Sequence, residues 1–270
     1  MVADSAIYQF DAGLVSVTLG VLMIAAAALG ARVAHQRGRA GKETAQTNLS
    51  AIETGLFGLL GLLLAFTFSG AASRFDNRAA LLIDAANAMH GAILRTDLYP
   101  AAERDTLRKD LRQYLELQIS FYNQESDPHS LGMLIQQSDA IQQQLWAKVS
   151  NWSRDPANSL ASVQMLNALD KVFALTASRQ IASQAHMPAA IVWLLFVMAI
   201  ATAYTSGYTH GASGKFSWAG YIGFSLLTAM VIYVTLDLDS PGRGIIRRDV
   251  QEQSFIALRP LLTAQSVANP

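Results

Sequence analysis

The amino-acid sequence predicts an all-α integral membrane protein with four transmembrane helices and a helical extramembrane region between the second and the third. Three observations support this fold class. The chain of 270 residues is 51% hydrophobic, yet only 15% of its residues are charged, against roughly a quarter in an ordinary soluble domain. Its apolar residues gather into four long stretches. The region between the second and third stretches lacks such runs, and its apolar residues recur at helical spacing.

Each of the four stretches is long enough to cross a bilayer as a helix, which needs about 20 largely apolar residues. Arg74 ends the second stretch and Asp237 ends the fourth. The stretches cover residues 12–31, 54–73, 187–208 and 216–236. We therefore expect a first transmembrane helix with a basic loop at residues 1–50 and a second transmembrane helix at 51–73. A helical extramembrane region should follow at 74–186, then the third and fourth transmembrane helices at 187–236 and a polar tail at 237–270.

The first stretch has an alternative interpretation as a cleaved signal peptide, because AAAALGA resembles a cleavage region of small residues. The tail before it carries Asp4 and Asp11 but no Lys or Arg, which is the opposite of the basic start of a signal peptide. We expect a retained transmembrane helix that serves as a peripheral anchor of the bundle.

The orientation of the helices follows from the basic residues that flank them, which are enriched in cytoplasmic loops. The loops after the first and third helices carry Arg32, Arg37, Arg39, Lys42 and Lys215, which favours cytoplasmic loops and an extracytoplasmic middle region. Against this, seven basic residues flank the spans on the other face, so that the two counts nearly cancel: Arg74, Arg78, Lys171, Arg179, Arg243, Arg247 and Arg248. The charge bias is therefore slight.

The middle region is predicted to consist of helices separated by prolines. Between Arg74 and Leu98 there is no proline and one glycine, so the second transmembrane helix should continue outward as one long helix. Pro100 opens the next helix, and another covers residues 131–152. Their apolar stripes are Leu107, Leu111, Leu115, Ile119 and Tyr122, and Leu134, Ile141, Leu145, Val149 and Trp152. A last helix from about Asn158 runs directly into the third transmembrane helix, where Pro188 should kink it or mark its membrane entry.

Composition and motifs exclude several classes of function. The formal net charge is zero, so no nucleic-acid partner is expected. There is no cysteine, no pair of histidines has i, i+4 spacing, and phosphate-loop, dinucleotide and nucleophile-elbow motifs are missing. We expect no metal, no cofactor and no enzyme activity.

Five polar residues on long helices could form a buried cluster that holds the helices in register: Asp84, Asn87, Asn167, Asp170 and Arg179.

The second transmembrane helix is the most informative of the four. It is interrupted by glycines and ends with small residues at four-residue steps, which allow close helix packing. One of its faces changes from apolar to polar towards the water, as a pore lining with an apolar constriction would, through Leu62, Phe66, Ser69, Ser73 and Asn77. An ordinary helix interface would show the same small-residue seam, so both interpretations stand.

The tail after the fourth helix, DLDSPGRGIIRRD, brings carboxylates, glycines and arginines close to the lipid surface. Two glycines permit backbone conformations that are closed to other residues, and Arg243 could pair with Asp237 or Asp239. The candidate residues of this loop are Asp237, Asp239, Pro241, Gly242, Arg243 and Gly244. A plain polar stop with an interfacial turn is the alternative.

Three blocks of the sequence resemble the bacterial bestrophin-like membrane proteins, a domain of unknown function. They are GLLGLLLAFTFSGAASRFDNRAALLIDAANAMHGAILRTDLYP from Gly58, LNALDKVFALTASRQIASQAHMPAAIVWLL from Leu166 and DLDSPGRGI from Asp237. They cover most of the chain after residue 50, apart from residues 115–160. Where the family pattern has an acidic residue before an Ala-Asn pair, this chain has Ala85, and Asp84 should face about 100° away on a helix.

The resemblance implies likeness to bestrophins, which are homopentameric anion channels with four membrane helices and a large cytoplasmic helical region. It therefore implies a bestrophin-like architecture, a homo-oligomer in the bacterial inner membrane, contact with the lipid bilayer and small anions as the transported species. The cytoplasmic placement of the middle region conflicts with the charge bias, and both placements stay open.

Two functions from different classes remain. The first is an oligomeric membrane ion channel or pore whose second transmembrane helix lines the pathway around Phe66. The second is a non-conducting scaffold or sensor whose middle region binds a partner, and the scarcity of ionisable residues within the spans favours it. An axial passage surrounded by the second helix would favour the channel.

Overall fold

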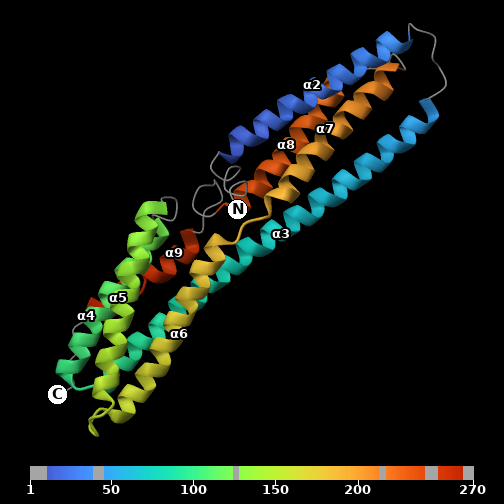
Figure 1. The fold of residues 1–270 in the computed structure, drawn as a ribbon. Coiled ribbons are helices and arrows are strands. Elements are labelled where there is room, and N and C mark those ends of the chain that lie inside the picture. The colour runs from blue at the N-terminus through green and yellow to red at the C-terminus, as the bar shows by residue number, and fades with distance from the viewer. Residues whose placement is uncertain (1–10, 39–45, 124–127, 213–216, 241–248, 264–270) are drawn as a thin grey trace. The chain divides into compact units, whose positions relative to one another are not determined.

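The computed structural model describes residues 11–38, 46–123, 128–212, 217–240 and 249–263 and confirms the all-α fold class (Figure 1). No strand occurs in these ranges. The elements are α2 (Ala12–Gly38), α3 (Gln46–Arg95), the 3-10 helix η1 (Thr96–Leu98), α4 (Ala101–Asn123), α5 (Pro128–Trp152), α6 (Ser159–Gln184), α7 (Ala189–Ala212), α8 (Trp218–Asp239), α9 (Asp249–Ile256) and α10 (Arg259–Thr263).

Four helical stretches are long and apolar enough to cross a membrane, as the sequence predicted. They lie in α2, in α3, in the stretch Ser159–Gly211 that covers α6 and α7, and in α8. The predicted outward continuation of the second transmembrane helix is also confirmed, because α3 is a single helix of 50 residues. Asp237 does not end the fourth span, since α8 continues to Asp239. The chain is therefore a multi-pass membrane protein.

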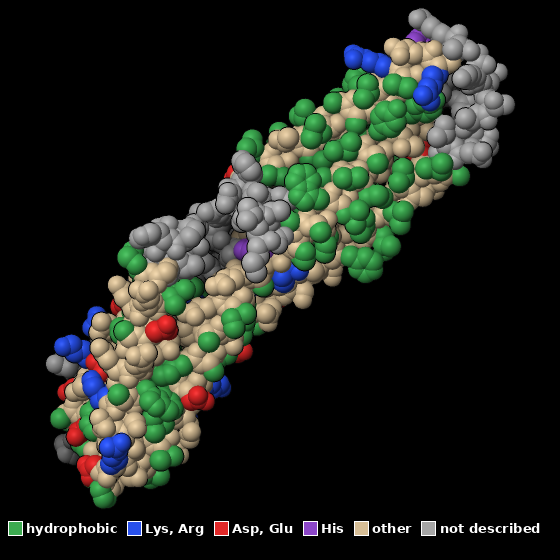
Figure 2. Space-filling model, in the orientation of Figure 1, with side chains coloured by type: hydrophobic (Ala, Val, Ile, Leu, Met, Phe, Trp, Pro, Cys, Tyr) green, Lys and Arg blue, Asp and Glu red, His purple; other side chains and the backbone are tan. Residues whose placement is uncertain are grey.

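The membrane unit consists of the described residues of 1–74 and 186–240, and α2 packs closely against α7 and α8 within it. Leu19 and Met23 of α2 are fully buried. One face of α2 is thus part of the packed unit, while most of its apolar span is unburied, and its expected role as a peripheral anchor stays a prediction. Figure 2 shows hydrophobic side chains over the visible surface of this unit, as a lipid-facing surface requires.

Backbone proximity sets the packing of α2 against α7. A Cβ atom on Gly207 would lie 2.7 Å from the Cα of Ala27, and one on Gly211 would lie 2.6 Å from the Cα of Ala31. Only glycine fits at such distances, and Gly207 and Gly211 form the Gly-x-x-x-Gly spacing that is typical of close membrane helix pairs. This seam was not predicted, although the GYTHG sequence signals it.

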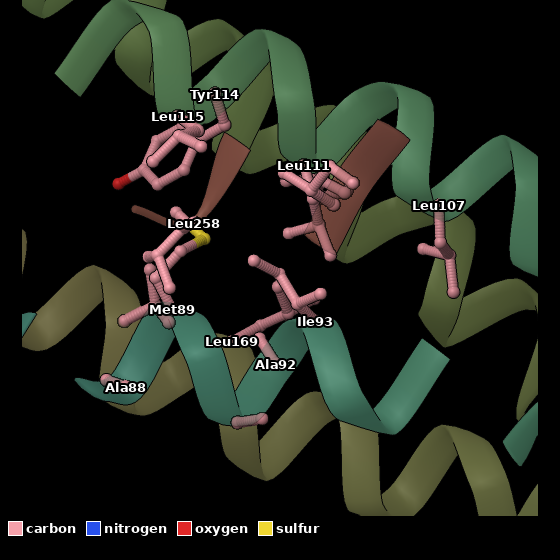
Figure 3. Close-up of a cluster of buried hydrophobic side chains, with 14 of the residues drawn as sticks. Ala88, Met89, Ala92, Ile93, Leu107, Leu111, Tyr114, Leu115, Leu169 and Leu258 are labelled. Carbon is pink, nitrogen blue, oxygen red and sulfur yellow. The ribbon is translucent and has the colours of Figure 1, made fainter. Parts of the chain in front are cut away.

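The second unit consists of the described residues of 75–185 and 241–270 and has its own hydrophobic core. Figure 3 shows this core, in which Met89 and Ile93 of α3 face Leu111 and Leu115 of α4. The predicted stripes are confirmed as core positions wherever their side chains are described: Leu107, Leu111, Leu115, Ile119, Leu134, Ile141, Leu145 and Val149 are buried. The side chain of Tyr122 lies outside the described residues, and Trp152 packs against the core while partly exposed.

As expected, α6 leads directly into the third transmembrane helix, with a short break between α6 and α7 at Pro188. The chain is non-helical from Ala185 to Pro188, and the expected effect of Pro188 is confirmed at this junction. Arg78 of α3 caps the end of α6. Its Nε donates to the carbonyl of Ala182 at 3.1 Å and its Nη2 to that of Ala185 at 2.6 Å, so a cation satisfies two terminal carbonyls.

Candidate functional site

One face of α3 is uncovered in the chain and carries all five predicted pore-lining residues. Leu62 is 52% exposed and Phe66 is 68% exposed. Ser69, Ser73 and Asn77 are exposed too. Steps of three and four residues keep these positions near one face of the helix. The structure therefore leaves this face available, and its role in lining a pathway stays a prediction.

The opposite face of α3 is the packed one. Leu60, Thr67 and Ala71 are at most 5% exposed, and the hydroxyl of Thr67 donates to the carbonyl of Leu63 at 2.8 Å. These buried residues lie well away from Phe66 around the helix. The chain thus uses one side of α3 for its own packing and leaves the other without a cover among the described residues.

Three glycines in the first part of α3 also face open space. A Cβ atom on Gly55, Gly58 or Gly61 would meet no atom within 4 Å. Glycine inside a helix costs about 1 kcal/mol relative to alanine, and here no packing within the described chain offsets that cost. The predicted small-residue seam on this helix is therefore not used inside the described chain.

A buried carboxylate lies near the start of the apolar part of α3. Glu53 is 8% exposed, and its Oε1 lies 3.7 Å from Nδ1 of His210 on α7. The hydroxyl of Tyr221 on α8 donates to the carbonyl of Ser206 at 2.9 Å in the same part of the membrane unit. The sequence interpretation missed this pair, because Glu53 was placed just outside the span and His210 lies 157 positions further along.

A second buried carboxylate, Asp239, joins three segments at the end of α8. Its side chain is fully buried, and its Oδ1 accepts from Nε of Arg74 at 2.6 Å. Its Oδ2 accepts from the backbone nitrogen of Met187 at 2.7 Å. The Nη2 atom of Arg74 is buried and has no hydrogen-bond partner within the described ranges. This ion pair ties α3 and α8 to the entrance of α7.

The expected pairing of Arg243 with Asp237 or Asp239 stays a prediction, because Arg243 lies outside the described residues. Among the described residues, Asp239 pairs with Arg74, a partner that the sequence did not suggest. Asp237 is also buried, at the end of α8. Pro241, Gly242, Arg243 and Gly244 lie outside the described residues.

The predicted buried polar cluster is wrong for four of its five members. Asp84, Asn87, Asn167 and Asp170 have exposed side chains in the chain, because they lie on the outer faces of α3 and α6. The fifth member, Arg179, is partly buried: its Nη1 donates to Oε1 of Gln118 at 3.2 Å, and its guanidinium lies 5.1 Å from the centre of the Phe255 ring.

The structure also shows the surroundings of Ala85, the position at which this chain departs from the acidic residue of the family pattern. Ala85 is buried at 3% exposure, whereas Asp84 is exposed. Successive helical residues point about 100° apart, so Asp84 does not take the place of a buried acid at position 85.

The buried polar network of the second unit is centred on Tyr114. Its hydroxyl lies 2.9 Å from Oγ1 of Thr176 and accepts from Nε2 of Gln142 at 3.0 Å. Burial raises the pKa of Tyr114 above its ordinary value of 10. Tyr99 lies in the same core, bonds to Ser162 at 3.1 Å, and has its pKa raised by burial as well. These hydroxyls link α4 to α5 and α6 and, through Tyr99, the end of η1 to α6.

Comparison with protein families adds an independent observation. The Bestrophin-like domain matches residues 21–254, which is most of the chain. The chain belongs to the bestrophin-like family. This family is channel-like, and its match covers three of the apolar helices completely, the first one from residue 21 onward, and most of the second unit. Neither the curated proteins nor the solved structures contain a match. Within the described ranges, no group of three or more His, Asp or Glu is placed to hold a metal ion.

Proposed function

We propose that this bestrophin-like protein is an oligomeric ion channel of the bacterial inner membrane, in which α3 lines the pathway and small anions are the permeant species. The observation that carries the proposal is the uncovered face of α3. It is apolar at Leu62 and Phe66 and hydroxyl-bearing at Ser69 and Ser73. An apolar constriction followed by hydrogen-bond donors is a common lining of ion pathways.

A single helix face cannot enclose a passage, so the pathway requires several copies of the chain. Closed cyclic symmetry would place the same face of each α3 around one axis. The resemblance to bestrophins suggests five copies. The open glycines at positions 55, 58 and 61 support this arrangement, because they would let neighbouring helices approach closely.

Anion selectivity rests on the neutral donors of the lining. The hydroxyls of Ser69 and Ser73 and the amide of Asn77 can donate hydrogen bonds to an anion that has lost part of its water. The carboxylates of Asp76 and Asp84 are exposed further along α3 and would attract cations. Reversal potentials under a chloride gradient therefore decide between the two ion classes.

The test is ion flux through liposomes that contain the purified protein, with Phe66→Ala as the variant. Phe66 is 68% exposed on the proposed lining, whereas Phe68 is 41% exposed and points about 200° away around the helix. We expect Phe66→Ala to change the conductance several-fold and Phe68→Ala to leave it unchanged. Absence of flux at all voltages, or equal effects of the two variants, would refute the channel.

The absence of native cysteine allows a second test. Ser69→Cys places one thiol on the proposed lining, and a charged thiol reagent added from the water should then block conduction. Phe68→Cys is the matched control, and its thiol should not respond. Block of the control alone would place the pathway on another face of α3.

A non-conducting scaffold remains the second candidate, and the exposed apolar residues of α6 favour it. Leu160 is 78% exposed, Ile181 is 72% exposed and Val163 is 49% exposed, all in the second unit. Such a surface is typical of an interaction site. Crosslinking in cells that recovers one stable partner protein on α6, together with a liposome preparation that conducts no ions, would support this function over the channel.

A further inference from the structure

An apolar groove of about 450 Å³ lies between α2 and α8 in the membrane unit. It is lined along α2 from Gly13 to Ile24 and along α8 from Ile222 to Tyr233. Its volume lies within the range of about 300 to 1,000 Å³ that is usual for small-molecule sites. The proposed ion pathway does not include this groove, because the pathway lies on α3.

The groove opens onto the surface that faces lipid. Val17 and Val21 on one rim are 65% and 60% exposed, and Leu226 and Met230 on the other rim are 64% and 60% exposed. Because both helices are apolar enough to span the membrane, these rims meet hydrocarbon and not water. A ligand would therefore enter sideways from the bilayer.

One polar group inside the groove has no partner. Ser16 is 4% exposed, and its Oγ is buried with no hydrogen-bond partner among the described residues. Helical hydroxyls usually donate to the carbonyl four residues earlier, as Thr18 does to Leu14 at 2.7 Å. An unsatisfied buried hydroxyl costs about 1 to 3 kcal/mol, so the Ser16 hydroxyl is available to an acceptor on a ligand.

The dimensions select the kind of ligand. From Gly13 to Ile24 the groove follows α2 for about 17 Å, at 1.5 Å per residue. One leaflet of the hydrocarbon core is about 15 Å deep, half of the full thickness. A volume of 450 Å³ over about 17 Å gives a mean cross-section of about 26 Å², or a width of about 6 Å. A helix of a second copy, with a diameter of about 10 to 12 Å, could place only side chains in a groove of this size, whereas an extended acyl chain could follow it over its whole length.

The polar end of the groove lies near one membrane surface. Asp11 caps α2, with Oδ1 accepting from the backbone nitrogen of Gly13 at 2.8 Å. The Tyr233 ring lies next to Gly13, and tyrosine is enriched at the boundary between lipid and water. Ser16 is one turn inside this boundary, where the ester groups of a lipid meet its hydrocarbon chains.

We propose that the groove between α2 and α8 binds one acyl chain of a membrane glycerolipid, whose ester carbonyl accepts a hydrogen bond from the hydroxyl of Ser16. The acyl chain of the lipid extends from Ser16 past Val21 towards Ile24. The lipid comes from the leaflet at whose surface α2 begins and α8 ends.

The test uses the full-length protein in liposomes of phosphatidylethanolamine and phosphatidylglycerol that contain a glycerolipid with a photoreactive diazirine on one acyl chain. After illumination and digestion, mass spectrometry locates the labelled peptides. We expect labels on residues 13–24 and 222–233. Val21→Trp, which fills the groove, should lower labelling of both segments by at least about 5-fold, while Leu22→Trp, on a neighbouring face of α2, should leave it unchanged.

Ser16→Ala tests the polar contact separately. Loss of one hydrogen bond predicts a decrease in retained lipid of about 2- to 10-fold, measured by native mass spectrometry in mild detergent. Thermal unfolding of each variant shows whether the fold is intact. Equal labelling in Val21→Trp and Leu22→Trp overturns the proposal, as does labelling spread evenly over all four spans. Crosslinks from this groove to a second copy of the chain, without lipid label, also overturn it.

Discussion

Gly207→Ala should destabilise the membrane unit by pushing α7 away from α2. The added Cβ would lie 2.1 Å from the carbonyl oxygen of Ala27 and 2.7 Å from its Cα, and ordinary contact begins at 3.4 Å, so the two helices must separate by about 1.3 Å. Overpacking of this kind costs about 1 to 3 kcal/mol. At about 2 to 4 °C per kcal/mol for a chain of this size, the unfolding midpoint should fall by about 2 to 12 °C.

Gly223→Ala on α8 is the matched control, because a Cβ there would meet no atom within 4 Å. Alanine favours a helix over glycine by about 1 kcal/mol, so this variant should unfold at the wild-type temperature or slightly above it. Intrinsic fluorescence of the four tryptophans follows unfolding of the detergent-solubilised protein. If Gly207→Ala unfolds no earlier than Gly223→Ala, the close approach of α2 and α7 at Ala27 is wrong.

Two further substitutions test the buried polar groups. Asp239→Ala removes a fully buried carboxylate and leaves Arg74 without this partner. Breaking a buried ion pair costs about 3 to 5 kcal/mol, and we expect a decrease in the free energy of unfolding near the lower end of this range, because Arg74 is 28% exposed and partly screened by water. Asp105→Ala is the control: its carboxylate is 75% exposed, so the free energy of unfolding should change by less than about 1 kcal/mol, and equal unfolding midpoints for the two variants would contradict the buried junction. Burial raises the pKa of Tyr114, so the stability that its neutral hydroxyl contributes is complete below about pH 10 and is lost as the pH rises towards the higher folded-state value. Tyr114→Phe should therefore cost about 1 kcal/mol at pH 8 and unfold with a shallower dependence on pH above pH 10, and an unchanged pH dependence would show that other groups control it.

Local periodicity explains why the helices and their buried stripes were predictable. A stripe such as Leu107, Leu111 and Leu115 repeats at helical spacing, and any helix that carries it must bury it. The long helix α3 was predictable for a similar reason, since no helix breaker occurs where it continues beyond the membrane span. These inferences need only neighbouring residues.

Contacts between distant residues were not predictable from local patterns. Asp239 lies 165 positions from Arg74, and no local pattern indicates that these two residues meet. The buried polar cluster failed because Asp84, Asn87 and their counterparts on α6 were assumed to face one another, whereas both helices turn these side chains outwards. Periodicity shows which residues share a face, but it does not show which face another helix covers.

Glycine use separates the two kinds of helix contact in this protein. On α7, Gly207 and Gly211 lie against the backbone of α2, so their role is complete within one chain. On α3, Gly55, Gly58 and Gly61 meet nothing, although each should weaken the helix by about as much as the glycines of α7 do. A helix that is weakened without internal compensation, and that also leaves Phe66 exposed, favours the proposed assembly, in which these residues would find contacts. The uncovered face of α3 is therefore the surface on which an oligomeric pathway should be sought, and the closed seam of α2 and α7 is the surface where substitutions should affect folding alone.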